Sequence, residues 1–432
     1  MREPEGFTHL AENICVEHII DPALASRVIS GVDERECSYC GRQVDDDELP
    51  FAVSMNVVGQ LVFDTASWLF AEGYDGDPED MGDFYFEQHD TEHVVETVLD
   101  GALDPTVADE VVAHVSDAIS TPKKWADSQL QDEFLFSWDS FADAVKHRSR
   151  FVYIGAEERK GREKEPPARV SRFLEGLDAY VRDDMLTEFR PGDLLYRARM
   201  VDDGFAFIDQ ARRDPARSLG PAPAGKASAG RLNPEGVGLF YSATTPDLAV
   251  KETALHSQFD DAVVGGFEVK RKLTILDFTK RPSLPSVFDE ARRTEYVYAS
   301  FADDFVERLT RSVRLTGEER VEYVVTQVIS EYFRWAPKRR LDGIAWDSHL
   351  LREGESGKNV LVWASADDVQ SDPPASRDPK TSALWRRSFE TSPATLTLAG
   401  RRMNVYAATR SVTAHFVGIP GDDDPDPMFM SM

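Results

Sequence analysis

The sequence predicts an α+β protein with two folded parts, a mainly helical acidic front and a mixed region of strands and helices behind it. Three observations support this prediction. Apolar residues recur at helical spacing in the front part. Beyond residue 170, short apolar runs that read as strands alternate with helical patterns. Between the two parts, residues 157–170 combine mixed charge with Gly and two prolines, which is the composition of a linker.

The predicted organisation has four segments. Residues 1–150 form the helical domain, 151–170 the linker, 171–366 the mixed domain, and 367–432 a carboxyl-terminal extension whose acidic tail is disordered. A chain of 432 residues with 41% hydrophobic residues can build two or three ordinary cores. The chain has no membrane-spanning apolar run, and its amino terminus has no signal-peptide core. We therefore expect a cytoplasmic protein with no membrane contact.

The charge of the chain is strongly acidic, with a formal net value of -28. This argues against direct binding of nucleic acid, because a phosphate backbone is bound through clustered Lys and Arg. Residues 43–122 contain no Lys or Arg but 20 Asp and Glu. Such a block is usually a solvated face. The alternatives are a docking surface for a basic partner or a screen that keeps nucleic acid away.

The three cysteines of the chain, Cys15, Cys37 and Cys40, lie in the first forty residues, and His18 completes two closely spaced pairs. Four such ligands suit tetrahedral zinc, and four protein ligands leave no open position, so we expect a structural site. The segment between the pairs is predicted to form a short helix. The alternative is three reduced cysteines beside an unrelated histidine.

Helices are predicted at several places in the front domain. Val57, Leu61, Thr65 and Trp68 recur at helical spacing. Further amphipathic patterns occupy residues 92–99, 107–119 and 134–145. The frequency of apolar residues favours folded helices over a disordered acidic tail.

Residues 230–256 are the most informative stretch of the chain. Asn233 and Pro234 with flanking glycines predict a tight turn, and residues 239–243 predict a short buried strand. Thr245 followed by Pro246 is an N-cap with a first-turn proline, so a helix is predicted to begin at Pro246 and run to His256.

Glu252 lies on the apolar stripe of that helix, between Leu248 and Leu255. One interpretation is a glutamate at the edge of the stripe whose carboxylate reaches water. The other is a half-buried carboxylate that faces a cleft also lined by Arg231.

A strand is predicted over residues 193–200, with Arg197 and Arg199 on one face. The loop that follows carries further basic residues: Arg212, Arg213, Arg217 and Lys226. Positive charge concentrated inside an acidic chain suits an anionic ligand. The alternative is surface arginines on a flexible loop.

The remaining predicted elements complete the mixed domain. They are a lead-in helix from about Phe173 to Tyr180, a helix over 321–332, and strands over 273–278, 343–346, 359–363 and around Leu396 and Val405. Ser348 follows the 343–346 strand, where a serine is usually only a turn residue. Arg410 and His415 have the R-x4-H spacing of HEPN ribonucleases, but their segment reads as a strand, so we treat that match as chance.

The central stretch resembles the RES domain, a family of bacterial toxins, whose pattern G-R-aromatic-N-P-x-G, strand ending in Tyr and A-x-x-E helix matches residues 230–252. Leu232 replaces the usual aromatic residue. Residues 195–197 resemble the opening strand of the family, and residues 342–348, which include Ser348, resemble its serine-bearing strand. The resemblance covers about residues 186–366, and the front of the chain resembles the domain found ahead of RES and HEPN toxin domains.

This resemblance implies an ADP-ribosyltransferase-like fold, a split and mostly antiparallel sheet around a cleft that holds NAD+. It implies that the bond between nicotinamide and ribose is cleaved by hydrolysis or phosphorolysis. Arg231 and Arg197 would hold the pyrophosphate, and Glu252 would stabilise the developing ribosyl cation. Tyr241 would stack on a base, and Ser348 would hydrogen-bond the phosphates or ribose.

The resemblance also implies control by a partner antitoxin of the Xre type, and a homodimer stays open. Two alternatives to NAD+ depletion are kept. The same site would serve an enzyme that transfers ADP-ribose to a protein. The acidic front would suit a sensor, for instance in phage defence, whose RES site acts only on a trigger.

Overall fold

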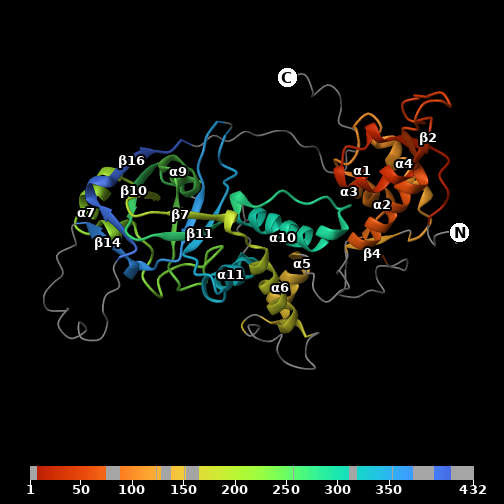
Figure 1. Ribbon diagram of the computed structural model, residues 1–432. Helices are drawn as coiled ribbons and strands as arrows, with labels where there is room; N and C mark the ends of the chain where they lie inside the picture. Colours follow the sequence, from red (N-terminus) through yellow and green to blue (C-terminus); the bar gives the residue numbers. More distant parts are fainter. Residues whose placement is uncertain are drawn as a thin grey trace, which may run out of the picture.

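The computed structural model describes residues 7–73, 88–122, 124–127, 138–149, 151, 165–255, 257–310, 319–352, 354–372 and 394–409. Figure 1 shows a front lobe of helices and small sheets, a second lobe built on a large sheet, and α10 (Arg293–Thr310) between them. No helix within these ranges is long and apolar enough to cross a membrane. The predictions for His256, Arg410, His415 and the acidic tail lie outside the described residues.

The front lobe contains the helices α1 (Pro22–Val28), α2 (Met55–Leu69), α3 (Thr91–Leu99) and α4 (Ala108–Ala118). One small sheet has the order β1 (Asn13–Cys15), β3 (Ala52–Ser54), β2 (Val32–Glu34), and a second has the order β4 (Phe70–Glu72), β6 (Trp125–Asp127), β5 (Gln88–His89). The helices predicted around residues 57–68 and over 92–99 and 107–119 are confirmed, as is the short helix between the two cysteine pairs. Asp21 caps that helix by accepting hydrogen bonds from the backbone amides of Ala23 and Leu24.

The buried face of α2 differs from the predicted one. Val58, Val62 and Ala66 are fully buried, whereas the side chain of Val57 is 36% exposed. Thr65 is the member of the predicted stripe that is fully buried. The pattern allowed two overlapping stripes one residue apart, and packing against α3 and α4 selected the second.

The second lobe is built on a sheet with the order β14-β15-β10-β8-β9-β13-β12-β11-β7, and β16 also pairs with β10. These strands are β7 (Leu186–Phe189), β8 (Leu194–Val201), β9 (Phe240–Ala243), β10 (Asp261–Val269), β11 (Leu273–Asp277), β12 (Gly343–Trp346), β13 (Asn359–Val362), β14 (Val369–Asp372), β15 (Leu396–Ala399) and β16 (Met403–Ala407). Among the described strands, β11 with β12 and β14 with β15 run parallel, and the other pairs are antiparallel. The predicted α+β class is therefore confirmed as a mixed fold around a large sheet.

The sheet is nearly divided between β8 and β9. These two strands share one registered pair, Tyr196 with Ala243, whereas β8 pairs with β10 from Leu194 to Val201. Strands β14, β15 and β16 lie on the β8 side of this division. Residues assigned to a carboxyl-terminal extension therefore contribute strands to the main sheet.

Helices cover both faces of the sheet. On one face, α6 (Pro166–Tyr180), α10 and α11 (Glu319–Trp335) share a core with Phe173, Phe301 and Ile344. On the other face, α7 (Gly204–Ala211) and α8 (Pro215–Leu219) pack near Phe240 and Phe267. The helix α9 (Pro246–Ala254) lies over β8, β9 and β10.

The boundary between the lobes lies earlier than the predicted linker suggests. The helix α6 begins at Pro166, and Val170 is fully buried although it was assigned to the linker. The helix α5 (Trp138–Asp143) and the π-helical segment η4 (Ala144–Arg148) were assigned to the front domain. Trp138 and Phe141 nevertheless pack in the core beneath α10 and α11, so this part of the chain belongs to the second lobe.

The lobes meet at residues 286–296, at and before the start of α10. Phe288 is buried within the core of the front lobe. Arg27 of α1 forms an ion pair with Glu290 at 2.9 Å. Trp68 of α2 packs edge-on to Tyr296, and the guanidinium of Arg293 lies 4.7 Å from the Trp68 ring centroid. The amino-terminal end of α10 is therefore attached to the front lobe.

Candidate active site and metal site

The predicted tight turn around Asn233 is confirmed and strongly braced. The Asn233 side chain is buried, and its Nδ2 donates hydrogen bonds to the carbonyls of Ser228 at 3.0 Å, Pro234 at 3.2 Å and Val237 at 2.9 Å. Gly236 has a φ of +87°, which a residue with a side chain adopts only with strain. Asn233 therefore fixes the loop from within.

Helix α11 braces the same loop from outside. Gln327 Nε2 donates to the carbonyls of Gly230 at 2.8 Å and Asn233 at 2.9 Å. The Thr326 hydroxyl donates to the carbonyl of Arg231. These bonds fix the backbone on both sides of Arg231.

The Arg231 side chain points to the carboxyl-terminal end of α10. Its Nη1 donates to the carbonyl of Arg308 at 3.2 Å and to the carbonyl of Leu309. The last carbonyls of a helix have no partner within the helix, and the helix dipole favours a cation there. Arg231 thus caps α10 in this structure, and its predicted contact with pyrophosphate stays a prediction.

Tyr241 of β9 closes the braced loop. Its hydroxyl donates to Asn233 Oδ1 at 2.8 Å and accepts a hydrogen bond from the backbone amide of Leu232 at 3.1 Å. Burial raises the pKa of the Tyr241 phenol above its ordinary value. The hydroxyl therefore stays protonated and holds the loop, while stacking of the ring on a base stays a prediction.

Glu252 and Ser348, both assigned to the site by the family resemblance, lie in direct contact. The Ser348 hydroxyl donates to Glu252 Oε1 at 2.6 Å and accepts from the backbone amide of Leu350 at 3.1 Å. Ser348 is buried and Glu252 is half-buried. The predicted apolar stripe of α9 holds at Leu248, which is fully buried, and is wrong at Leu255, which is 47% exposed because the helix has ended.

Asn359, which the sequence reasoning did not single out, is the third member of this group. Its Nδ2 donates to the same oxygen, Glu252 Oε1, at 2.6 Å. A polar residue at the start of a buried strand was the available signal, but such residues also occur at ordinary strand ends. The contact joins segments that are far apart in the sequence.

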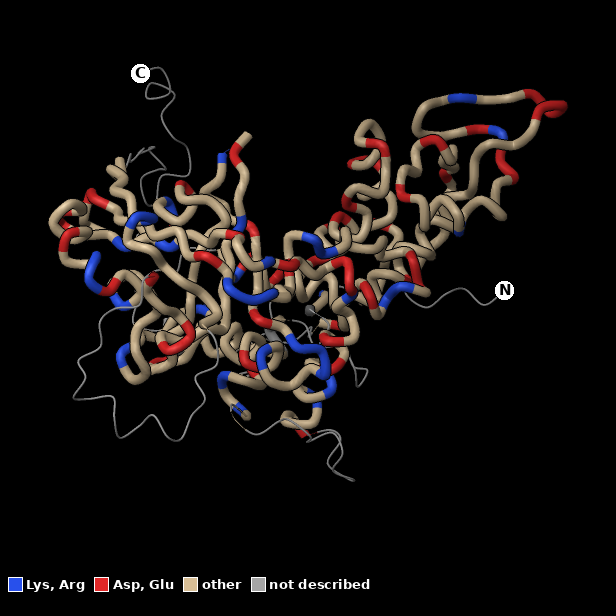
Figure 2. Tube along the Cα trace, turned by 60° about the vertical axis from the view of Figure 1, so that its left-hand side comes forward, with Lys and Arg blue, Asp and Glu red and all other residues tan. Residues whose placement is uncertain are grey.

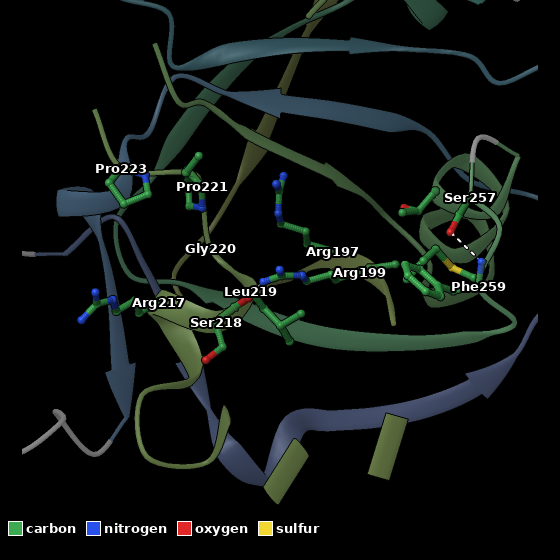
Figure 3. A pocket seen from close by; sticks show the side chains of 14 residues that line it. Arg197, Arg199, Arg217, Ser218, Leu219, Gly220, Pro221, Pro223, Ser257 and Phe259 are labelled. Carbon is green, nitrogen blue, oxygen red and sulfur yellow. Dashed lines mark hydrogen bonds between the residues drawn. The ribbon is translucent and has the colours of Figure 1, made fainter. Parts of the chain in front are cut away.

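A pocket of about 610 Å³ opens where β8 leaves β9. It is lined by β8 from Arg197 to Met200, by residues 217–223, and by Thr253, Ser257 and Phe259. Figure 3 shows Arg197 and Arg199 side by side, with Arg217 at one end of the pocket and Phe259 at the other. Since Thr253 lines the pocket, α9 forms part of its wall. The predicted site residues Arg231, Tyr241, Glu252 and Ser348 are not among its described lining residues.

The pocket concentrates positive charge. Arg197 Nη1 donates to the carbonyl of Tyr241 at 2.8 Å and so bridges the division of the sheet. Burial lowers the pKa of Arg197 to about 10, which still leaves its guanidinium charged at neutral pH. Arg199 Nη1 donates to the carbonyl of Ser218 at 3.0 Å, and Arg217 is exposed.

The positive charge of the pocket contrasts with the acidity of the chain as a whole. The whole chain has a formal net charge of -28, and Figure 2 shows acidic residues along the front lobe and frequent Lys and Arg residues in the second lobe. Three arginines in one pocket therefore favour an anionic ligand.

The predicted cysteine and histidine residues meet at one point in the front lobe. The ligand atoms of Cys15, His18, Cys37 and Cys40 all lie within 4.8 Å of one another, so the cluster could bind a metal ion. The Nε2 atom of His18 is buried and has no hydrogen-bond partner within the described residues, which fits a ligand atom. Gly41, with a φ of +68°, completes the turn after Cys40.

The backbone around Cys37 favours its thiolate. Burial alone would raise the pKa of Cys37, but the amides of Cys40, Cys15 and Tyr39 surround the sulfur and lower it overall. The Cys15 amide, for example, donates to Cys37 Sγ at 3.3 Å. Burial and the neighbouring Cys37 sulfur instead raise the pKa of Cys15, so Cys37 is the ligand whose surroundings favour the metal-binding thiolate.

Comparison with known families gives two matches. A family described as RES domain matches residues 194–386, and one described as HEPN/RES N-terminal domain 1 matches residues 31–159. The first range begins at β8 and includes the pocket, Glu252, Ser348 and Asn359. The second includes Cys37 and Cys40 but begins after Cys15 and His18. No curated protein and no solved structure matches the chain.

Proposed function

Because this chain is a RES-domain protein with a HEPN/RES N-terminal domain in front, we propose that it cleaves NAD+ between nicotinamide and ribose. RES domains are associated with NAD-related enzymatic activity. The observation that carries the specific proposal is the Glu252 carboxylate, which Ser348 and Asn359 hold on α9. The next residue of that helix, Thr253, lines the pocket with the three arginines. An anionic dinucleotide that reacts at a ribose needs both of these features.

The reaction breaks the bond between ribose C1′ and the nicotinamide nitrogen. The bonding electron pair leaves with nicotinamide, which becomes neutral, and positive charge develops on the ribose. Glu252 would stabilise that charge and accept a proton from the incoming water or phosphate. Water would give ADP-ribose, and phosphate would give its 1-phosphate.

The pocket arginines would hold the other end of the substrate. Arg197 is already fixed by its hydrogen bond to the Tyr241 carbonyl, so little side-chain freedom is lost when it contacts the pyrophosphate. Arg199 and Arg217 line the same pocket and would share this role. Arg231 would contribute indirectly by holding the loop, unless its guanidinium leaves α10 when substrate binds.

The test is incubation of purified protein with NAD+, with and without phosphate, followed by mass spectrometry of small molecules and protein. We expect free nicotinamide with ADP-ribose or its 1-phosphate. A mass increase on protein would indicate ADP-ribosyl transfer instead, and absence of turnover would contradict the proposal.

The matched variants are Glu252→Gln and Asp247→Asn. Glu252→Gln removes the charge while keeping the shape, so we expect the rate to fall roughly 100-fold or more. Asp247 is exposed in the first turn of the same helix, so its variant controls for lost charge on α9. A folded Glu252→Gln protein with the parental rate would exclude Glu252 as a catalytic residue.

The metal proposal is one structural zinc ion at Cys15, His18, Cys37 and Cys40. The unpartnered His18 Nε2 and the amide-surrounded Cys37 sulfur support it. Four protein ligands fill a tetrahedral shell, so the ion would stabilise the front lobe and take no part in the reaction. Metal analysis of purified protein should give about one equivalent of zinc for four such ligands.

A further inference from the structure

We infer that Asn359 is a positioning residue that fixes which Glu252 carboxylate oxygen faces the substrate, an inference that rests on the function proposed above. Asn359 and Ser348 both donate to Oε1, each at 2.6 Å. Within the described residues, Oε2 accepts no hydrogen bond. The two oxygens of one carboxylate are therefore distinguished by the protein.

The sheet itself holds Asn359. It is the first residue of β13, and it pairs in register with Ala243 of β9 and Trp346 of β12. Ala243 packs against Leu248 of α9, so this end of β13 lies beneath the helix that carries Glu252. The amide thus reaches Glu252 from a strand that is hydrogen-bonded to a neighbour on each edge.

The chemistry of the two donors makes the orientation specific. The Nδ2 group of Asn359 can donate but cannot accept, so it contacts only an acceptor oxygen. Ser348 accepts from the Leu350 amide, which directs the Ser348 hydroxyl proton toward Glu252. Two donors fix Oε1 in place, and Oε2 is left as the oxygen that stabilises the ribosyl cation and takes the proton.

Asn359 would act differently from the residues that are predicted to contact the substrate. Asn359 has no assigned contact with substrate, and its effect on the reaction would pass through Glu252. Removing its donor should therefore lower kcat and leave KM nearly unchanged, because substrate binding uses the arginine pocket. A misplaced carboxylate typically costs about 10- to 100-fold in rate.

The experiment compares four variants of the full chain with the parent. Asn359→Leu removes the donor. Asn359→Asp replaces it with a second carboxylate against Glu252. The double variant Glu252→Gln with Asn359→Asp exchanges the amide and the carboxylate across the contact. Asn404→Asp, at an exposed position of β16, is the control for the same change on another strand.

We expect Asn359→Leu to lose about 10-fold or more in kcat with little change in KM. Asn359→Asp should lower the unfolding temperature, and the double variant should recover that temperature. Turnover should not recover, because the carboxylate then lies on β13 instead of α9. Parental kcat in Asn359→Leu and Asn359→Asp would overturn the inference. Additive losses of stability in the double variant would also overturn it.

The two kinds of measurement separate this inference from the proposed function. If the parent does not consume NAD+, the proposed function fails, and the stability of the exchange variant still decides whether Asn359 fixes Glu252. If the parent consumes NAD+ and the Asn359 variants keep the parental kcat, the proposed function stands and the inference fails.

Discussion

The structure gives Arg231 a role that differs from its predicted one, and the substitution Arg231→Lys separates the two. In the structure, the Arg231 guanidinium donates to two carbonyls at the end of α10. Lysine keeps the charge but presents one ammonium in place of the planar fork, so it cannot reproduce the same geometry. A cap on α10 should therefore be weakened even though the net charge is unchanged.

The magnitude follows from the bonds that are lost. Hydrogen bonds to charged groups contribute about 1.5–3 kcal/mol each, and a cation at a helix terminus about 0.3–1 kcal/mol. Because Arg231 is half-buried, the lower values apply, and Arg231→Ala should cost about 2–4 kcal/mol of unfolding free energy. Arg231→Lys should cost about half as much. For a lobe of this size, these losses correspond to roughly 5–10 °C and 2–5 °C in unfolding temperature.

The assay is thermal unfolding of the full chain together with KM for NAD+. Arg217→Lys is the matched control, because Arg217 lines the pocket and is exposed. We expect Arg231→Lys to lower the unfolding temperature, and Arg217→Lys to raise KM while leaving that temperature unchanged. If Arg231→Lys instead keeps the parental unfolding temperature and strongly raises KM, Arg231 is a substrate ligand and the capping argument is refuted.

Two further predictions concern the lobes. Cys37→Ser should remove bound zinc and unfold the front lobe, because the free energy of metal binding at such a site is folding free energy. A variant that keeps its α-helical circular dichroism and full zinc content would contradict this. A chain that starts at Trp138 should fold and turn over NAD+. A chain that starts at residue 170 should lose cooperative unfolding, because it lacks Phe141 and the first turn of α6. Equal calorimetric transitions in both chains would contradict this.

Local signals in the sequence predicted the elements around the site well. Thr245 and Pro246 mark the start of α9, and Asn233 marks the turn, because caps and turns depend on residues a few positions apart. The helix α10 was missed although Val297, Phe301, Phe305 and Leu309 follow one another at intervals of four residues and are buried. This spacing is the pattern of an amphipathic helix with one buried face.

Other features depend on contacts between distant segments, which no local pattern contains. Glu252 and Asn359 are separated by 107 residues, and Arg231 and Arg308 by 77. The interpretation of Arg231 as a residue that faces a cleft with Glu252 came from the local sequence, and its pyrophosphate role came from the family pattern. The position of its guanidinium depends on where α10 ends, which only the packed structure reveals.

The helix α10 links the two lobes physically. Its beginning lies against Trp68 of the front lobe through Tyr296 and Arg293, and its end accepts the hydrogen bonds of Arg231. A helix of 18 residues is about 27 Å long and stiff along its axis, so it connects two distant places with little slack. The loop that contains Arg231 also closes on Tyr241, whose carbonyl holds Arg197 in the pocket. The front lobe and the pocket are therefore attached to one continuous set of packed and hydrogen-bonded elements. This is the structural reason to treat the front lobe as part of the environment of the candidate active site.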